Sequence, residues 1–341
     1  MDTASASAHT HGQDIFSKDP AGCMRAVVWT GKSVKMKHIP KPKIMKASDV
    51  VVKITACSVS PDFATDVCGN AAGLEKNQVL GSEAVGIVDS VGADVQKVKE
   101  GDRVAHPHAR SVPGVQAEYA RVPFGDMNCY KLPSGVSDDK ALLGAAHWCK
   151  LRGAKTVLGV EHCLERIKFA HDHMNLEVVD RRDLSCAQVV AKLQQILPPA
   201  GADAVIDASG SSTSAGFLSG LEKTFGMETE PEPADTFKEM LMIVRKCGHI
   251  SIATDYMRSI PSFPIGHVAM KSVTVHAGRT PAQKYYPKVY AAIESGELDP
   301  SVLISHRLAL EEVPEAYSRI AKKERGFLKV FVAPHEMRSK S

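Results

Sequence analysis

The pattern of hydrophobic and polar positions changes near the middle of the chain. Between Met24 and about Pro123, apolar residues form short runs separated by Gly and Pro, as in Ala26–Trp29 and Val50–Ile54. Runs of this length bounded by turn residues predict β-strands. Further strands are expected at residues 34–36, 79–92, 98–104 and 114–123. This half of the chain is therefore expected to form a compact barrel of antiparallel strands.

After about Asp138, strand-like runs alternate with helical stretches. Buried strands are expected at residues 156–160, 176–179, 204–207, 249–253 and 273–276. The acidic segment 228–235 is expected to be a solvated loop. Two amphipathic helices are expected at residues 285–297 and 311–323, and a closing strand at residues 327–332. Strands that alternate with helices imply a parallel sheet. The expected fold class is α/β.

Composition limits the classes of function. The 341 residues are 44% hydrophobic and 24% charged, which is ordinary for a soluble globular protein with room for two domains. The net charge of +3 comes from dispersed basic residues, so a nucleic-acid partner is not expected. The apolar runs are strand-sized, so no membrane span is expected. Residues 1–22 lack the apolar core of a secretory signal and read as a disordered tail.

The eight cysteines are scattered and form no Cys-x-x-Cys pair. In a chain of this length they are best interpreted as free thiols in a reducing compartment. A cytoplasmic location is therefore expected.

The segment that follows Gly153 carries the most specific chemistry. An apolar run ends at Glu161, and the helix after it places Arg166 five residues further on. This is the pattern of the second strand of a dinucleotide-binding fold, whose terminal acid binds the adenosine ribose and favours NAD over NADP. The plainer alternatives are a solvated acid for Glu161 and a surface charge for Arg166. The Gly-x-Gly-x-x-Gly turn that normally holds the pyrophosphate occurs nowhere in the sequence.

Several short sequence motifs occur in the order and spacing of the zinc-type alcohol dehydrogenases of the medium-chain dehydrogenase/reductase superfamily, and the chain resembles that family. They extend from about Met24 to Pro334 and comprise Val79-Leu-Gly-x-Glu83-Ala-Val-Gly86, Gly101-Asp-Arg-Val104, Gln116-Ala-Glu-Tyr119, Glu161 with Arg166, Asp203–Gly210 and Gly248-His-Ile-Ser-Ile. The acidic segment and the stretch Gly278–Tyr285 are most similar to the glutathione-independent formaldehyde dehydrogenase branch.

The resemblance implies a GroES-like substrate domain over residues 23–140, completed by a helix and closing strand from residues 280–341. It implies a Rossmann-like dinucleotide-binding domain over residues 141–279. In relatives, a helix, the first strand, the glycine turn and its helix lie between the positions that match Leu143 and Trp148, which here are separated by only four residues. The Rossmann-like sheet is therefore expected to lack its first strand, and the strands beside it to be exposed or to pair anew.

The family's catalytic zinc ligands would fall at Ser60, at Ser82 and near Leu143–Ala146. Serine hydroxyls are poor zinc ligands, so no bound metal is expected although zinc is the family default. The family's four-cysteine structural zinc lobe is also absent. His106 and His108 stand in its place, where they could join Cys57, Cys68 or Glu83 in an improvised site or, as the favoured alternative, remain loop histidines.

The resemblance also implies where the substrate and cofactor would bind. A carbonyl without zinc needs another electrophile, and the candidates are Ser60, Ser82, His106 and His147. Ser209 and Thr254 follow strands that line the cofactor site in the family.

The expected function is that of an NAD-dependent oxidoreductase acting on a small alcohol or carbonyl compound. Two alternatives remain open at this point: a degenerate, non-catalytic relative that serves as a binding partner, and a truncated or mis-spliced gene product that lacks the pyrophosphate-binding turn. A small-molecule substrate is the expected partner, and a homo-oligomer stays open.

Overall fold

The computed structural model describes residues 22–68, 74–107, 114–141, 149, 151–209, 235–253, 263–278, 282–322, 324 and 326–335. The chain divides into two compact units. Unit 1 comprises Met1–Gly144 and Ala282–Ser341, and unit 2 comprises Ala145–Pro281. No helix among the described residues has the length and apolar character needed to cross a membrane.

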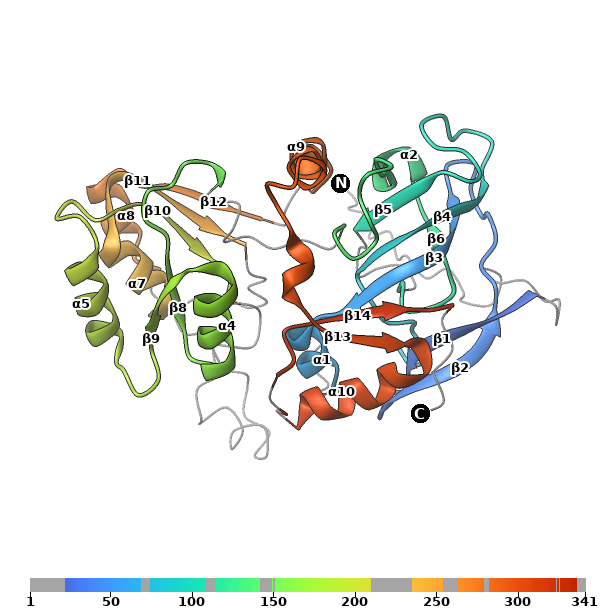
Figure 1. Ribbon diagram of the computed structural model, residues 1–341, viewed down its shortest axis with the longest axis horizontal. Coiled ribbons are helices and arrows are strands. Elements are labelled where there is room, and N and C mark those ends of the chain that lie inside the picture. Colours follow the sequence, from blue (N-terminus) through green and yellow to red (C-terminus); the bar gives the residue numbers. More distant parts are fainter. Residues whose placement is uncertain are drawn as a thin grey trace, which may run out of the picture. The chain divides into compact units, whose positions relative to one another are not determined.

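Unit 1 is rich in β-structure (Figure 1). Its strands are β1 (Cys23–Trp29), β2 (Val34–Pro40), β3 (Val50–Val59), β4 (Glu83–Val91), β5 (Arg103–Pro107), β6 (Tyr119–Val122), β7 (Tyr130–Lys131), β13 (Ile304–Ala309) and β14 (Lys329–Ala333). Its α-helices are α1 (Pro61–Cys68), α2 (Gly125–Asn128), α9 (Ala282–Glu294) and α10 (Val313–Ala321), with 3₁₀ turns at Pro300–Leu303 and Leu310–Glu312.

Seven of these strands form one sheet in the order β13-β14-β3-β4-β5-β7, with β6 also paired to β3. The pairs are antiparallel, as expected for the barrel, except that β13 and β14 run parallel. Strand β3 is central because Val50, Val52 and Ile54 are buried in the unit's core. Helix α10 adds Tyr317, whose hydroxyl donates to the buried Gln116 Oε1 at 3.0 Å.

Two of the motif phrases are explained by this packing. Gly86 lies where β4 passes β3, and a Cβ atom there would lie 2.3 Å from the Lys53 carbonyl oxygen. Gly101 has φ of +86° in the turn before β5. Asp102, the next residue, accepts from the Lys99 amide and pairs with Lys131. Gly86 permits the close strand crossing, and Gly101 and Asp102 shape the turn. These two sequence motifs are therefore explained by the needs of the fold.

Unit 2 alternates strands and helices. Its strands are β8 (Leu158–Glu161), β9 (Glu177–Asp180), β10 (Ala202–Asp207), β11 (Val244–Ile252) and β12 (Thr274–Ala277). Its helices are α4 (Leu164–Met174), α5 (Cys186–Ile196), α7 (Asp235–Ile243) and α8 (Ile265–Lys271). Helix α5 starts at a capping box in which Ser185 and Gln188 exchange hydrogen bonds.

The parallel strands of unit 2 form two separate sheets. Strand β8 pairs with β9, whereas β10, β11 and β12 form a three-stranded sheet. In the doubly wound order 3-2-1-4-5-6, the first strand lies between the second and the fourth. Removing it leaves a pair and a triplet, which is the arrangement of the described strands. The expected loss of the first strand therefore appears here as a break in the sheet.

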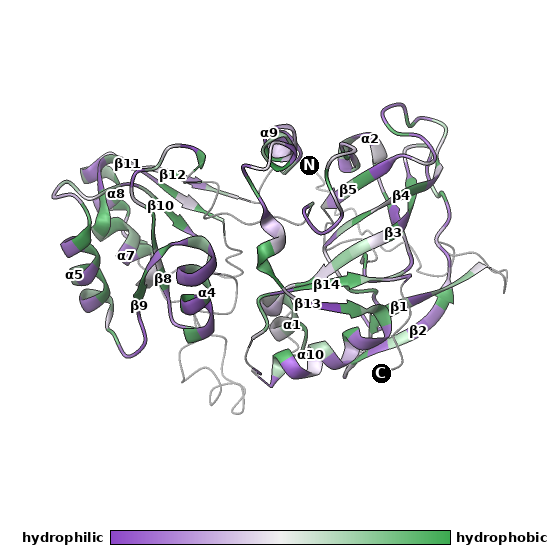
Figure 2. Ribbon diagram, viewed as in Figure 1, coloured by the Kyte–Doolittle hydropathy of each residue, from purple (hydrophilic) through white to green (hydrophobic). Residues whose placement is uncertain are grey.

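The strands beside the break are incompletely buried. Val160 of β8 and Ile206 of β10 are 39% and 48% exposed, although interior strands of a parallel sheet are normally covered on both faces. Helix α4 has no buried residue and is mostly purple in Figure 2. The described strands are therefore exposed and do not pair anew.

Two segments discussed from the sequence fall outside the described residues. They are the N-terminal tail, of which Gly22 alone is described, and the acidic segment up to residue 234.

Candidate functional site

The first candidate site lies at one end of the barrel of unit 1. Cys57 of β3 pairs with Ala84 of β4, so Ser60 and Ser82 lie just beyond the same end of this ladder. Val330 of β14 pairs with Val59, which brings Lys329 to that end as well. Ser60 is half-buried and Ser82 is exposed. The register thus gathers the two predicted serines around a charge pair that the sequence had not singled out.

That charge pair is formed by Glu83 and Lys329. The Lys329 ammonium lies 2.8 Å from Glu83 Oε1, and the Ser58 hydroxyl donates to the same oxygen at 2.6 Å. Burial alone would raise the pKa of Glu83. The attraction and hydrogen bonds of Lys329 and Ser58 outweigh burial, so the pKa of Glu83 is lowered. Glu83 is therefore ionised at neutral pH. We call Ser58, Ser60, Ser82, Glu83 and Lys329 the barrel-end cluster.

Buried weak acids surround the barrel-end cluster. Burial, reinforced by the Glu83 charge, raises the pKa of Cys57 and of Tyr286. Tyr286 stacks on Tyr290, with ring centroids 5.2 Å apart. These groups stay neutral at physiological pH, so the charges of this region come from Glu83 and Lys329.

A catalytic zinc does not fit these residues. Among the described residues, the barrel-end cluster offers serine hydroxyls and one carboxylate that already binds an ammonium group, and burial keeps the neighbouring Cys57 thiol neutral. Across the described residues, no three His, Cys, Asp or Glu side chains are grouped as a metal site would require.

His106, a candidate for an improvised site, has a structural contact. It is buried on β5, and its Nδ1 lies 3.0 Å from the Asn128 carbonyl oxygen. Its proposed companion His108 lies outside the described residues.

The second candidate site is the carboxyl end of β8 in unit 2. Glu161 Oε1 accepts from the backbone amides of His162 and Cys163 at 2.7 and 2.9 Å. Arg166 Nε lies 2.7 Å from Oε2 of the same carboxylate. The structure therefore brings the two residues of the predicted ribose site together, across the first turn of α4.

The electrostatics of Glu161 follow from these contacts. Partial burial favours the neutral form, but the Arg166 and backbone hydrogen bonds outweigh it and lower the pKa of Glu161. An ionised carboxylate suits ribose hydroxyls, which donate, and repels a 2′-phosphate. Arg166 holds the carboxylate in place at the strand end.

Of the remaining predicted residues, the structure describes Ser209 but not His147 and Thr254. Ser209 follows β10, where its amide and hydroxyl both donate to Asp207 Oδ1, at 3.0 and 2.7 Å. These bonds form a turn at the strand end. His147 and Thr254 lie outside the described residues, so their predicted roles stay predictions.

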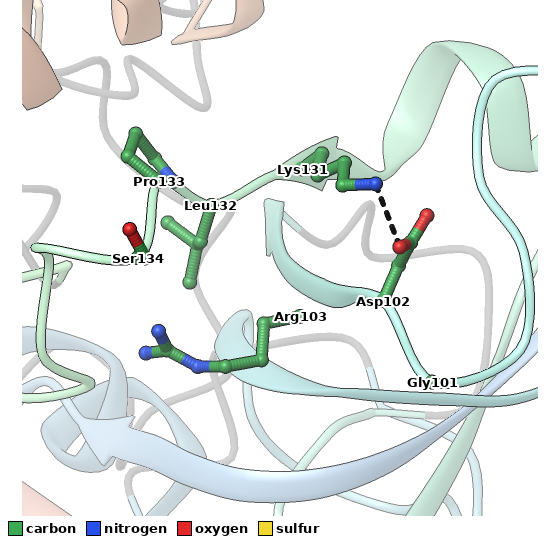
Figure 3. Close-up of a pocket in the computed structure, with 7 residues that line it drawn as sticks. All are labelled: Gly101, Asp102, Arg103, Lys131, Leu132, Pro133 and Ser134. Atoms are coloured by element: carbon green, nitrogen blue, oxygen red, sulfur yellow. Dashed lines mark ion pairs between the residues drawn. The ribbon is translucent and has the colours of Figure 1, made fainter.

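A surface pocket in unit 1 is separate from both candidate sites. It is open to solvent, and Figure 3 shows Asp102 and Lys131 facing each other in it. Arg103 donates to the Val136 carbonyl oxygen and to Asp138. Each charged residue in this pocket has a partner that stabilises the fold, and nothing in it corresponds to the predicted chemistry.

Comparison with known proteins identifies the family. The family described as Alcohol dehydrogenase GroES-like domain matches residues 46–134. A zinc-type alcohol dehydrogenase-like protein of Schizosaccharomyces pombe is 32% identical, with 92% of each chain covered. The zinc-type alcohol dehydrogenase-like protein AdhB of Bacillus subtilis is 27% identical, over 91% of this chain and all of its own.

Solved structures show the same fold. Alcohol dehydrogenase TADH from Thermus sp. ATN1 superposes with a TM-score of 0.75 at 24% identity, over 91% of this chain and 99% of that one. An alcohol dehydrogenase from E. coli CFT073, solved with NADH, has a TM-score of 0.69 at 18% identity and covers 92% of this chain and 100% of its own.

The chain belongs to the zinc-type alcohol dehydrogenase family of the medium-chain dehydrogenase/reductase superfamily. The α/β fold class, with its GroES-like and Rossmann-like parts, is thereby confirmed, and the relatives are alcohol dehydrogenase-like oxidoreductases. The narrower likeness to the formaldehyde dehydrogenase branch stays a prediction.

The alignment also measures what this chain lacks. The alignment with the fission-yeast relative has 393 positions, whereas 92% of 341 residues is about 314. About 79 positions of that alignment therefore have no counterpart in this chain.

Lys329 is the site residue that sequence reasoning missed. It is a single charge inside the otherwise apolar closing segment Phe327–Val332. A lone charge at such a position could have marked Lys329 as a candidate site residue. Its partner Glu83 lies 246 residues away in sequence, so only the sheet register reveals the pair.

Proposed function

We propose that this chain binds NAD(H) through the adenosine side of unit 2 and acts as an oxidoreductase on a small alcohol or carbonyl compound. The observation that carries the proposal is the Glu161 carboxylate, held ionised at the end of β8 by Arg166 and two backbone amides. The family and the NADH complex of a structural neighbour support it.

NAD, when bound, supplies hydride transfer at its nicotinamide ring. Glu161 would accept hydrogen bonds from the adenosine ribose and orient that end of the molecule. The backbone at Asp207–Ser209 would flank the cofactor, as small residues allow. The pyrophosphate would lack the amide groups of the usual glycine turn, so binding should be weaker than in a complete Rossmann domain.

In unit 1, the barrel-end cluster would meet the substrate oxygen. The hydroxyls of Ser60 and Ser82 can donate to a carbonyl, and the Lys329 ammonium places a positive charge beside them. Glu83 keeps that ammonium in position. This assignment gives the site an electrophile made of protein groups alone.

A second candidate is a non-catalytic relative that retains the fold as a binding partner. The break between β8 and β10 favours it, because the missing strand normally leads into the pyrophosphate turn. The other alternative is a truncated gene product. It also predicts that this chain does not bind NAD(H), but it predicts that binding returns when the missing strand–turn–helix is restored.

Calorimetric titration with NADH separates these candidates. We expect wild-type protein to bind, Glu161→Gln to bind at least tenfold more weakly, and Glu177→Gln, a substitution elsewhere in unit 2, to match wild type. A chimaera with the fission-yeast strand–turn–helix inserted between Leu143 and Trp148 should bind in the micromolar range, about −8 kcal/mol.

Each outcome identifies one candidate. Binding by wild type that depends on Glu161 supports the proposed function. Binding by the chimaera alone identifies a truncated dehydrogenase. If a folded chimaera also fails to bind, the non-catalytic relative is the correct reading.

A further inference from the structure

Strand β13 carries a bulge directly beside the start of β14. Ile304 pairs with Lys329 and His306 pairs with Val330, so Ser305 is an extra residue in the β13 strand. Bulges are rare in parallel pairs, and they commonly redirect a side chain next to an active site. Strands β13 and β14 lie side by side, with β14 next to β3 (Figure 1). The bulge therefore lies beside the strand that supplies Lys329 to the barrel-end cluster.

The Ser305 hydroxyl forms the hydrogen bonds of this bulge. It accepts from the Leu328 amide at 2.9 Å and donates to the Lys329 carbonyl oxygen at 3.1 Å. A hydroxyl has one proton and can accept twice, so His306 Nδ1, at 3.0 Å, fits as its second donor. The Ser305 side chain thus binds both ends of the two-residue segment Leu328–Lys329 and fixes its path.

The face on which Lys329 lies depends on this path. Val330 and Val332 belong to the core of unit 1, so Lys329 lies on the opposite face of β14. Ser58 lies on that same face of the neighbouring β3, because both of its sequence neighbours belong to the core. A slip of one residue would turn Lys329 into the apolar core and away from Glu83.

The position of the Lys329 ammonium is not secured by its ion pair alone. The Lys329 side chain is 17% exposed and that of Glu83 is 35% exposed. Ion pairs that water reaches contribute little, because two long side chains must be ordered to form them. A fixed backbone leaves only the side-chain rotamers to be ordered, which lowers this entropic cost. The bonds of Ser305 therefore help to determine where the ammonium lies.

A stack of rings holds the third partner of Ser305. The His306 ring stacks on Phe327, with centroids 4.2 Å apart and an angle of 8° between the planes. The Arg319 guanidinium lies 5.1 Å from the centroid of Phe327. Burial, reinforced by the charge of Arg319, lowers the pKa of His306, so its ring is neutral at physiological pH. These contacts orient His306 Nδ1 toward the Ser305 hydroxyl.

We propose that Ser305 is a positioning residue for the barrel-end cluster: its hydroxyl, at the bulge of β13, fixes the start of β14 so that the Lys329 ammonium is held on Glu83. The inference rests on the proposed function, and it deepens it by naming the residue that places the positive charge of the site. Ser305 acts through the backbone of β14 and is not itself a catalytic residue.

Amine labelling of the native full-length chain tests this assignment. The reagent is an acetylating N-hydroxysuccinimide ester, and mass spectrometry gives the rate at Lys329 relative to Lys131, which pairs with Asp102 elsewhere in unit 1. Ser305→Ala should raise this relative rate about fivefold, because the ammonium is released from Glu83. Ser305→Thr keeps the hydroxyl and should leave the rate unchanged.

A matched control removes a different hydroxyl of the same region. Ser301 donates to Asp299 in the turn before β13, and Ser301→Ala should leave the Lys329 rate at its wild-type value. If Ser305→Ala does not fold, Ser305→Cys keeps a similar volume with only a weak donor and acceptor, and it should raise the rate instead. No rise, an equal rise in Ser301→Ala, or an equal rise in Ser305→Thr would overturn the assignment.

A double-mutant cycle separates positioning from general support of the fold. If Ser305 and Glu83 act independently, the effects of Ser305→Ala and Glu83→Gln on the urea unfolding constant multiply. We expect the double variant to fall short of that product by about threefold, because each single variant already breaks the pair with Lys329. Multiplicative effects would mean that Ser305 only supports the fold, and they would overturn the assignment.

Turnover distinguishes this inference from the proposed function. In NADH-linked reduction of small aldehydes, Ser305→Ala should lower kcat about tenfold, and Ser305→Thr should retain the wild-type value. An unchanged kcat in a variant that releases Lys329 would overturn the role of Ser305 in the reaction. Release of Lys329 in a chain that reduces no aldehyde would support the positioning of Lys329 and refute the proposed function, so the two failures are distinguishable.

Discussion

The exposure of β10 leads to a quantitative prediction about two isoleucines on neighbouring strands. Ile206 of β10 is 48% exposed, whereas Ile250 of β11 is 1% exposed. Replacing either by Ala removes the same three carbon atoms. The difference between the two variants therefore reports mainly how deeply each side chain is buried.

The expected magnitudes follow from the lost carbons. At about 0.8 kcal/mol for each buried carbon, the three atoms are worth roughly 2.4 kcal/mol when fully buried. Ile250→Ala also leaves a cavity, so its total cost should lie near 3–4 kcal/mol. Ile206→Ala loses about half of the transfer term and encloses no cavity, so it should cost about 1 kcal/mol.

Differential scanning calorimetry measures the contrast. For a unit of this size, about 1 kcal/mol lowers Tm by roughly 3–5 °C. The transition of unit 2 should therefore fall by about 10–15 °C in Ile250→Ala and by about 4 °C in Ile206→Ala. Equal shifts would mean that Ile206 is covered in solution, and the exposure of β10 would be wrong.

Three further predictions concern other parts of the chain. Because the pKa of Glu161 is lowered in the folded protein, its stabilisation should be complete above its ordinary pKa of about 4.3 and lost as the pH falls below it. The difference in unfolding free energy between wild type and Glu161→Gln should accordingly shrink between pH 6 and about pH 3, and a pH-independent difference would contradict the assigned contacts. Tyr317→Phe should cost about 1–3 kcal/mol in urea unfolding, because the buried Gln116 Oε1 loses its donor, and a neutral effect would show that water reaches it. In native protein at neutral pH, iodoacetamide should label the exposed Cys23 and spare Cys57, whose burial raises its pKa. Mass spectrometry before and after unfolding measures this, and labelling of Cys57 in the native protein would contradict its burial.

Local pattern was sufficient for much of this protein. The change from short strands to alternating strands and helices predicted the α/β class, because side-chain periodicity reflects which face each element buries. The acid at the end of one strand and the arginine five residues later predicted that Glu161 and Arg166 lie at one strand–helix turn, and the structure adds that they contact each other. The short interval between Leu143 and Trp148 predicted the missing strand, because nearly the whole of the family pattern lies on either side of it.

Tertiary structure alone decided the rest. Glu83 and Lys329 meet because β14 pairs with β3 and β3 pairs with β4, and no local periodicity encodes a contact across 246 residues. The sequence likewise could not decide whether the strands beside the break would re-pair or stay exposed. Among the described residues, β8 and β10 stand in separate sheets, while Leu158 and Val205 pack against the same core around Val189.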